Sequence, residues 1–119
     1  MKFLLIANYP EQAQPLQPPK AMMDAMEVLL AEGFSKGWLK DTGGLKPTKD
    51  AVRIRAKGGK LTVMDGPFTE AKEIIGGYAI VETKTREEAI EIALRFMELR
   101  RTHDPDFEYE SKILPVEAT

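Results

Sequence analysis

The sequence predicts an α+β fold in which two helices cover one face of a mainly antiparallel sheet. Two segments with helical periodicity, 20–32 and 86–98, each lie between segments that are typical of strands. Alternating apolar and polar runs on either side of Gly58-Gly59 predict a β-hairpin inserted between the two strand–helix–strand units. At 119 residues, the chain is expected to form one domain over 1–119.

Composition excludes several classes of protein. The chain has no cysteine, so it has no disulfide, no thiolate metal site and no cysteine nucleophile. With 17 basic and 19 acidic residues its net charge is −2, which argues against binding along a nucleic-acid backbone. The apolar start Met1–Ala7 is too short for a signal peptide, and no run approaches the ~20 apolar residues that span a bilayer. A cytoplasmic protein without membrane or nucleic-acid partners is therefore expected.

The first half of the chain begins with a continuous apolar run at 2–7, as expected of a strand covered on both faces. The Pro- and Gln-rich segment 8–19 is expected to be a loop, and the helix after it is predicted to end at Gly33. A short strand is expected around Trp38. The apolar side of the helix carries three methionines that suit either core packing or an adaptable binding surface: Met22, Met23 and Met26.

The hairpin strands have one apolar and one basic face. Val52 and Ile54 alternate with Arg53 and Arg55, and the two arginines form either a solvated face or an anion-facing wall near Lys72.

The second half of the chain contains a strand at 78–83 and then a helix. Thr85 and Glu88 have the spacing of a capping box, in which each side chain accepts from the other's backbone N–H. On the helix, Glu91 and Arg95 are spaced to pair. The charged segment 100–106 is expected to be a connection.

The last strand is predicted from alternating residues at 107–113, with one dry face and one wet. Two helices on one side of the sheet leave its other face uncovered. An exposed apolar sheet face is commonly covered by a second copy, so a homodimer is expected.

The segment 64–78 is the predicted functional site, because two strand ends and a helix start meet there. Asp65 opens a turn in which Gly66 permits positive φ, and Thr69 is placed to cap one helical turn at 70–73. Gly76-Gly77 permits either a sharp reversal or the close approach of another backbone or a ligand. The same residues also suit a turn without chemistry. Asp65 is the candidate catalytic carboxylate; the candidate ligand-binding residues are Trp38, Gly66, Pro67, Phe68, Lys72 and Tyr78.

Asp65-Gly66-Pro67-Phe68, followed by Glu70, Lys72-Glu73, Gly76-Gly77-Tyr78 and Glu82, resembles the DGPF-motif branch of the YCII-related family. The resemblance implies a ferredoxin-like subunit that forms a dimeric α/β barrel. Members of the wider family are thought to use a His–Asp pair, and one resembles a dehydrochlorinase of an aromatic compound. The aspartate corresponds to Asp65, but the first helix, where the histidine normally lies, has none. Many DGPF proteins are also associated with sigma factors of the extracytoplasmic type.

Two classes of function follow. One is a dimeric module with a small-molecule pocket beside Asp65, either as a binding protein or as a non-catalytic accessory to a sigma-factor system. The other is an enzyme in which Asp65, with a pKa raised by burial, acts as acid or base on a small aromatic or anionic substrate. The only histidine, His103, is either a surface residue or a substitute base. No metal site and no cofactor are expected.

Overall fold

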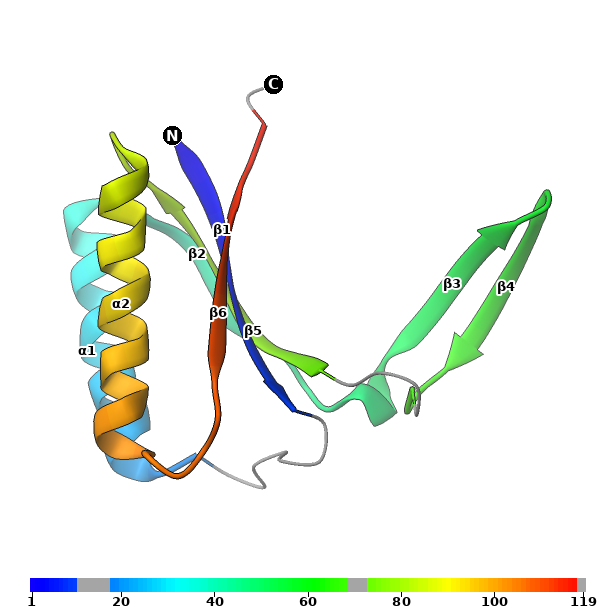
Figure 1. Ribbon diagram of the computed structural model, residues 1–119, viewed down its shortest axis with the longest axis horizontal. Helices are drawn as coiled ribbons and strands as arrows, with labels where there is room; N and C mark the ends of the chain where they lie inside the picture. The colour runs from blue at the N-terminus through cyan, green and yellow to red at the C-terminus, as the bar shows by residue number, and fades with distance from the viewer. Residues whose placement is uncertain (11–17, 69–72, 118–119) are drawn as a thin grey trace.

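The computed structural model describes residues 1–10, 18–68 and 73–117. Four strands form the main sheet in the order β2-β5-β1-β6, with every neighbouring pair antiparallel. Both helices lie on one face of this sheet (Figure 1), so the predicted α+β class is confirmed, and the strand order is consistent with a ferredoxin-like fold. The elements are β1 (Lys2–Pro10), α1 (Lys20–Lys36), β2 (Leu39–Gly44), a 3-10 turn η2 (Thr48–Asp50), β3 (Val52–Lys57), β4 (Lys60–Asp65), β5 (Glu73–Glu82), α2 (Arg86–His103) and β6 (Glu110–Pro115).

The core lies between the helices and the covered face of the sheet. Val81 on β5 is opposite Phe3 on β1 and Leu39 on β2, and all three side chains are buried. The helices complete this core with Leu29, Ala89, Ile92, Ala93 and Phe96. Leu4 and Ile6, the alternate residues of β1, remain half-buried on the other face.

The predicted end of the first helix at Gly33 is wrong. Helix α1 continues to Lys36, and Gly37 ends it in the left-handed conformation, with φ of 83°. Gly33 is buried inside the helix, where a Cβ atom would lie only 2.7 Å from the Trp38 ring and 2.8 Å from Leu39 Cβ. Gly33 is therefore required because Trp38 and Leu39 pack directly against it, and not because the helix ends there.

Strand β5 begins earlier than the sequence predicted. It starts at Glu73, and Gly76-Gly77 lie within it. Of the two roles predicted for this pair, the sharp reversal is therefore wrong, whereas the close approach of another part of the chain is present. The predicted helical turn at 70–73 and its cap Thr69 fall mainly on 69–72, outside the described residues.

Helix α2 begins as predicted and ends later than predicted. Thr85 Oγ1 accepts a hydrogen bond from the Glu88 N–H, which confirms the N-cap, while the Glu88 carboxylate accepts from Lys84 N–H. Arg95 pairs with Glu32 on α1 instead of Glu91. The helix extends through His103, so the segment from Arg100 that was expected to be a connection is its last turn.

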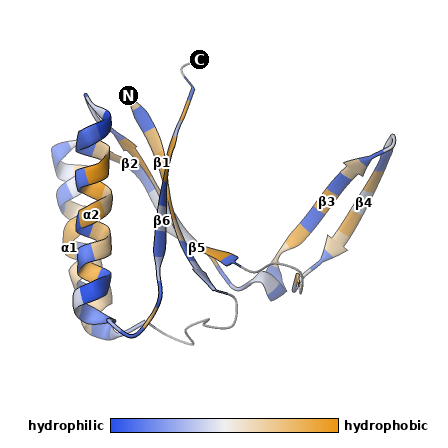
Figure 2. Ribbon diagram, in the orientation of Figure 1, coloured by the Kyte–Doolittle hydropathy of each residue, from blue (hydrophilic) through white to orange (hydrophobic). Residues whose placement is uncertain are grey.

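Strands β3 and β4 form a separate two-stranded sheet that projects away from the main body (Figure 1). Gly58 and Gly59, at φ of 58° and 78°, make the turn between them. Figure 2 shows hydrophobic and hydrophilic segments alternating along both strands.

Candidate functional site

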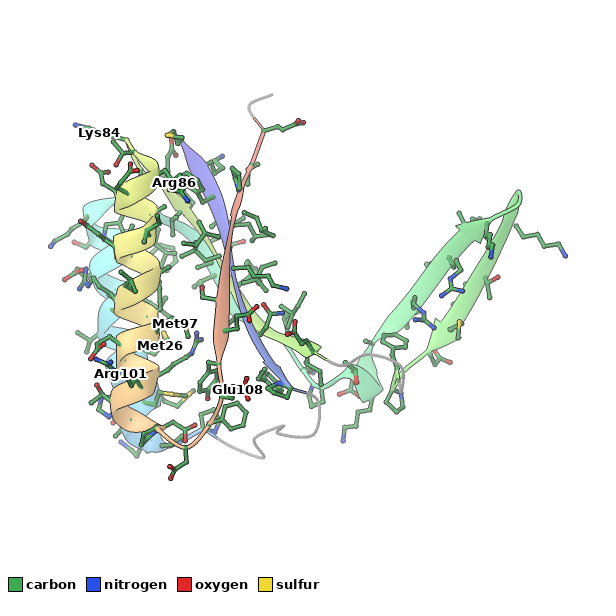
Figure 3. The ribbon with its side chains drawn as sticks, viewed as in Figure 1. Met26, Lys84, Arg86, Met97, Arg101 and Glu108 are labelled. Carbon is green, nitrogen blue, oxygen red and sulfur yellow. The ribbon has the colours of Figure 1, made fainter. Side chains whose placement is uncertain are left out.

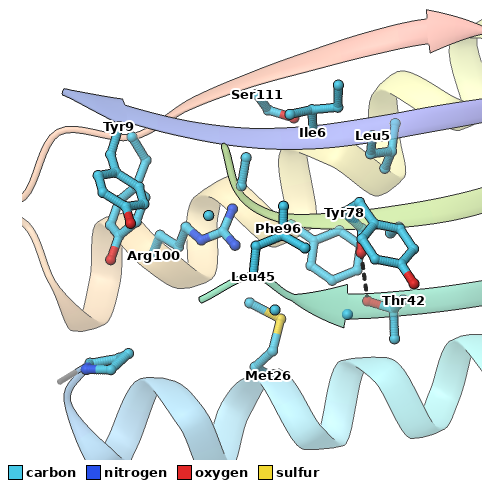
Figure 4. A pocket seen from close by; sticks show the side chains of 18 of the residues that line it. Leu5, Ile6, Tyr9, Met26, Thr42, Leu45, Tyr78, Phe96, Arg100 and Ser111 are labelled. Atoms are coloured by element: carbon cyan, nitrogen blue, oxygen red, sulfur yellow. Dashed lines mark hydrogen bonds between the residues drawn. The ribbon is translucent and has the colours of Figure 1, made fainter. Parts of the chain in front are cut away.

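A cavity of about 530 Å³ lies between the helix-covered face of the sheet and the two helices. Helix α1 contributes Met22, Met23 and Met26, and helix α2 contributes Phe96 and Arg100. Figure 4 shows Met26, Phe96 and Arg100 facing the strands of the sheet. The three methionines therefore form part of the cavity wall, and Met22 also belongs to the buried core.

Glycines form much of the strand side of the cavity. Gly43 and Gly44 of β2 pair with Tyr78 and Gly77 of β5, and all four residues line the cavity. A Cβ atom on Gly43 would lie 2.8 Å from the Tyr78 ring, whereas one on Gly44 would meet no atom within 4 Å. The missing side chains let the Tyr78 ring lie against the backbone and leave open space at Gly44.

Further along β5, Gly76 has the same role beside a second aromatic ring. A Cβ atom there would lie 2.5 Å from the Tyr9 ring, which also lines the cavity. The Gly76-Gly77 pair therefore shapes the cavity wall from within β5, at a break in the β1–β5 register.

Two side-chain hydrogen bonds join β2 to β5 next to the cavity. Thr42 Oγ1 donates to the carbonyl oxygen of Tyr78 at 2.9 Å (Figure 4). The Tyr78 hydroxyl donates to Asp41 Oδ2 at 3.3 Å. The negative charge of Asp41, together with burial and this hydrogen bond, raises the pKa of Tyr78, so the phenol is neutral. Tyr78 pairs with Ile6, so its ring lies on the uncovered face of the sheet and it is the backbone of Tyr78 that borders the cavity.

The opposite end of the cavity holds a cation among aromatic rings. The Arg100 guanidinium lies 5.0 Å from the centroid of the Tyr109 ring. The Tyr109 hydroxyl donates to Asp104 Oδ2 at 3.2 Å. The Tyr109 ring also packs on Phe107, which in turn contacts Tyr9 edge-on. Burial lowers the pKa of Arg100.

The Tyr109 phenol is expected to ionise late. Burial, followed by the charge and hydrogen bond of Asp104, raises the pKa of Tyr109 to about 12. Its stabilising contribution is therefore complete below about pH 10, the pKa of an unfolded tyrosine, and is lost as pH rises toward 12. Ultraviolet titration of the folded protein is expected to show a phenolate step near pH 12 that Tyr109→Phe removes. If every tyrosine of the folded protein ionises as in urea, this assignment is contradicted.

The residues predicted around Asp65 lie away from the cavity lining. Asp65 ends β4 with an exposed side chain, and its carboxylate makes no hydrogen bond within the described part of the chain. Gly66 does not use the positive φ that a glycine permits. It is required because a Cβ atom would lie 1.8 Å from the Thr48 carbonyl oxygen. The Gly66 N–H donates to Ala51, and the cis Gly66-Pro67 bond follows.

The remaining predicted residues are distributed over three places. Phe68 lies at the base of the hairpin, with the Arg53 guanidinium 5.0 Å from its ring centroid. Trp38 packs edge-on against Phe96 at 6.4 Å as part of the core. Tyr78 lines the cavity, and Lys72 lies outside the described residues.

The described residues carry no group of three His, Asp or Glu side chains placed to hold a metal ion. His103, half-buried at the end of α2, does not line the cavity. Across the described ranges, neither helix is long and apolar enough to cross a membrane.

Fold and cavity together define an α+β protein with two helices on one sheet face and a ligand-sized space beneath them. Residues 1–97 match the YCII-related domain, and the chain belongs to the YCII-related family. A segment of 57 residues is 37% identical to an uncharacterised protein, R00369, of Rhizobium meliloti (strain 1021). That match covers 48% of this chain and 46% of the relative, so it spans about half of the relative's length.

Proposed function

We propose that this chain is a homodimeric small-molecule-binding module of the DGPF branch, and that its ligand occupies the cavity between the sheet and the helices. The observation that carries the proposal is the cavity itself. Its volume of about 530 Å³ falls in the range of about 300–1,000 Å³ that is typical of ligand sites. Its lining is mostly apolar, with a few polar groups at its ends, which is the usual composition of such sites.

Substitution of Gly44 is a way to fill the cavity, because this position on β2 has room for a side chain. Because a Cβ atom there meets nothing within 4 Å, Gly44→Ala and Gly44→Leu are both expected to fold. The experiment is a thermal-shift screen of small metabolites against the wild type, Gly44→Ala and Gly44→Leu. A ligand at 100 times its Kd is expected to stabilise the wild type by about 2.7 kcal/mol. Gly44→Ala should retain most of that effect and Gly44→Leu should lose it.

Equal stabilisation of Gly44→Leu and the wild type would place the ligand elsewhere. A screen in which no molecule stabilises the wild type would overturn the proposal.

The dimer is supported by apolar surface that one copy leaves exposed. Val52, Ile54, Leu61 and Val63 occupy one face of the β3–β4 hairpin, and each is 56–77% exposed. Figure 3 shows this hairpin apart from the side chains of the main body. A two-stranded hairpin alone is marginally stable in water, so a second copy that covers this face would stabilise it.

The uncovered face of the main sheet adds to this surface. Leu4 pairs with Ile80 on one side and Leu114 on the other, so the three side chains share that face. Leu114 is 42% exposed, and the other two are half-buried. A second copy placed on this face would complete the dimeric barrel that the family resemblance implies.

The Asp65 carboxylate supports a second candidate function, acid–base chemistry on a small substrate. Its exposure, without a hydrogen bond in the described ranges, leaves it accessible to a ligand. Asp65→Asn is therefore expected to change the free energy of unfolding by no more than about 0.5 kcal/mol, while abolishing stabilisation by any ligand that depends on this charge. Thermal unfolding with and without the ligand measures both. A loss of about 1.5–3 kcal/mol without ligand would identify a charged turn bond instead.

A further inference from the structure

We propose that the cavity selects a small monocarboxylic acid with an apolar, ring-sized body, and that Arg100 binds its carboxylate. This inference rests on the proposed function, because it assigns the chemistry of the ligand in the same cavity.

The first support is the place of Arg100 in the cavity. It extends from the last turn of α2 into the space lined by Phe96, Leu45 and Tyr9 (Figure 4). Among the described residues that line the cavity, Arg100 is the only charged side chain. The site therefore carries a single positive charge within a largely apolar wall.

The second support is that the protein leaves this charge incompletely satisfied. Arg100 Nε is buried and has no hydrogen-bond partner within the described ranges. The contacts of the guanidinium are Met97 Sδ at 4.0 Å and one face of the Tyr109 ring. Asp104, the acid beside this ring, accepts from Tyr109, and Arg100 forms no ion pair in the described part of the chain. Arg100 as a whole is half-buried. A partly desolvated charge without a charged partner is costly, so an anion that enters here would gain compensation that the described residues do not supply.

The third support is the match between donor and acceptor shapes. A guanidinium presents parallel N–H donors that fit the two oxygens of a carboxylate. The Tyr9 and Ser111 hydroxyls line the cavity and make no side-chain hydrogen bond among the described residues, so both are available to the same anion. One cation balances one negative charge, which favours a carboxylate over a dianionic phosphate.

The apolar side chains that line the rest of the cavity indicate that the body of the ligand is apolar. Met26, Leu30 and Phe96 face the glycine-rich strands across the cavity, and together they fit a flat or slender hydrocarbon group.

Arg100, Tyr109 and Ser111 follow residue 97, where the match to the family ends. The charge selectivity therefore belongs to a part of the chain outside that match.

The test compares 2-naphthoate with its uncharged analogue 2-naphthamide, and with phenyl phosphate, by isothermal titration calorimetry. Wild-type protein is expected to bind naphthoate about 10- to 100-fold more tightly than naphthamide, the ratio given by one charge-assisted hydrogen-bonding group. Arg100→Met keeps the apolar stem and is expected to bind the two naphthyl probes equally. Arg100→Lys should retain part of the preference. Arg101→Met, a change at the exposed neighbour that pairs with Glu98, should bind as the wild type does.

Equal binding of naphthoate and naphthamide by the wild type would overturn this inference, and so would tighter binding of phenyl phosphate or no binding of naphthoate. These results leave the proposed function standing if any molecule stabilises the wild type and not Gly44→Leu. If Arg100→Met does not fold, the comparison of probes on the wild type and Arg100→Lys still decides the question.

Discussion

Replacement of Phe96 by alanine is expected to lower the free energy of unfolding by about 3–5 kcal/mol, the cost of removing a large buried aromatic side chain. Phe96 is only 8% exposed and packs edge-on against Trp38. It also forms the α2 wall of the cavity, so its loss joins a new void to an existing one. At about 4 °C per kcal/mol for a domain of this size, the thermal midpoint should fall by about 12–20 °C.

Leu94→Ala is the matched control, because Leu94 lies on the same helix and is 61% exposed. Its expected cost is within about 0.5 kcal/mol. Urea unfolding of both variants measures the difference. Similar losses in the free energy of unfolding for Phe96→Ala and Leu94→Ala would contradict the assignment of Phe96 to the core.

Val63→Asp is expected to dissociate the proposed dimer. Val63 is 66% exposed and lies opposite Ile54 on the apolar face of the hairpin. A carboxylate at the centre of an apolar interface should weaken association by about 2–4 kcal/mol, or roughly 30- to 1,000-fold in the dimer Kd. Sedimentation equilibrium measures this constant.

Thr62→Asp provides the control, because Thr62 is the neighbouring residue on the opposite face of β4 and pairs with Arg55. That variant should remain a dimer. A monomeric wild type at micromolar concentration, or equal effects of the two aspartates, would contradict the assignment of this face to the interface.

Hydrophobic periodicity predicted both helices, the order of helices and strands predicted the mainly antiparallel sheet, and the Thr85–Glu88 spacing predicted the helix cap. Prediction from the sequence failed where distant parts of the chain approach each other. Gly33 has the sequence appearance of a helix stop, but the close return of Trp38 is what requires it. Gly76-Gly77 is compatible in sequence with a reversal or with a close approach, and only the structure shows that in β5 it makes room for the Tyr9 ring and the cavity.

Arg100 was missed for a related reason. The charged residues around Arg100 favour a connection between helix and strand, so the predicted helix ends before this residue. Yet Ala93, Phe96 and Arg100 follow one another at three- and four-residue spacing, which places Arg100 on the apolar stripe of α2. A charged residue on the core-facing stripe of a helix indicates a cavity or polar site there, and this was the sequence signal that could have located the cavity. No sequence signal near Asp65 could place the cavity, because its walls come from four strands and two helices far apart in the chain.

Methionine-methyl NMR tests the central claim most directly, because the methionines divide by location. Met22, Met23 and Met26 line the cavity, whereas Met64 lies on β4 beside Asp65. On titration with a stabilising molecule from the screen, or with 2-naphthoate, the signals of the three cavity methionines are expected to shift while that of Met64 stays unchanged. A shift of Met64 alone would contradict the cavity as the binding site and would place the ligand at the Asp65 turn.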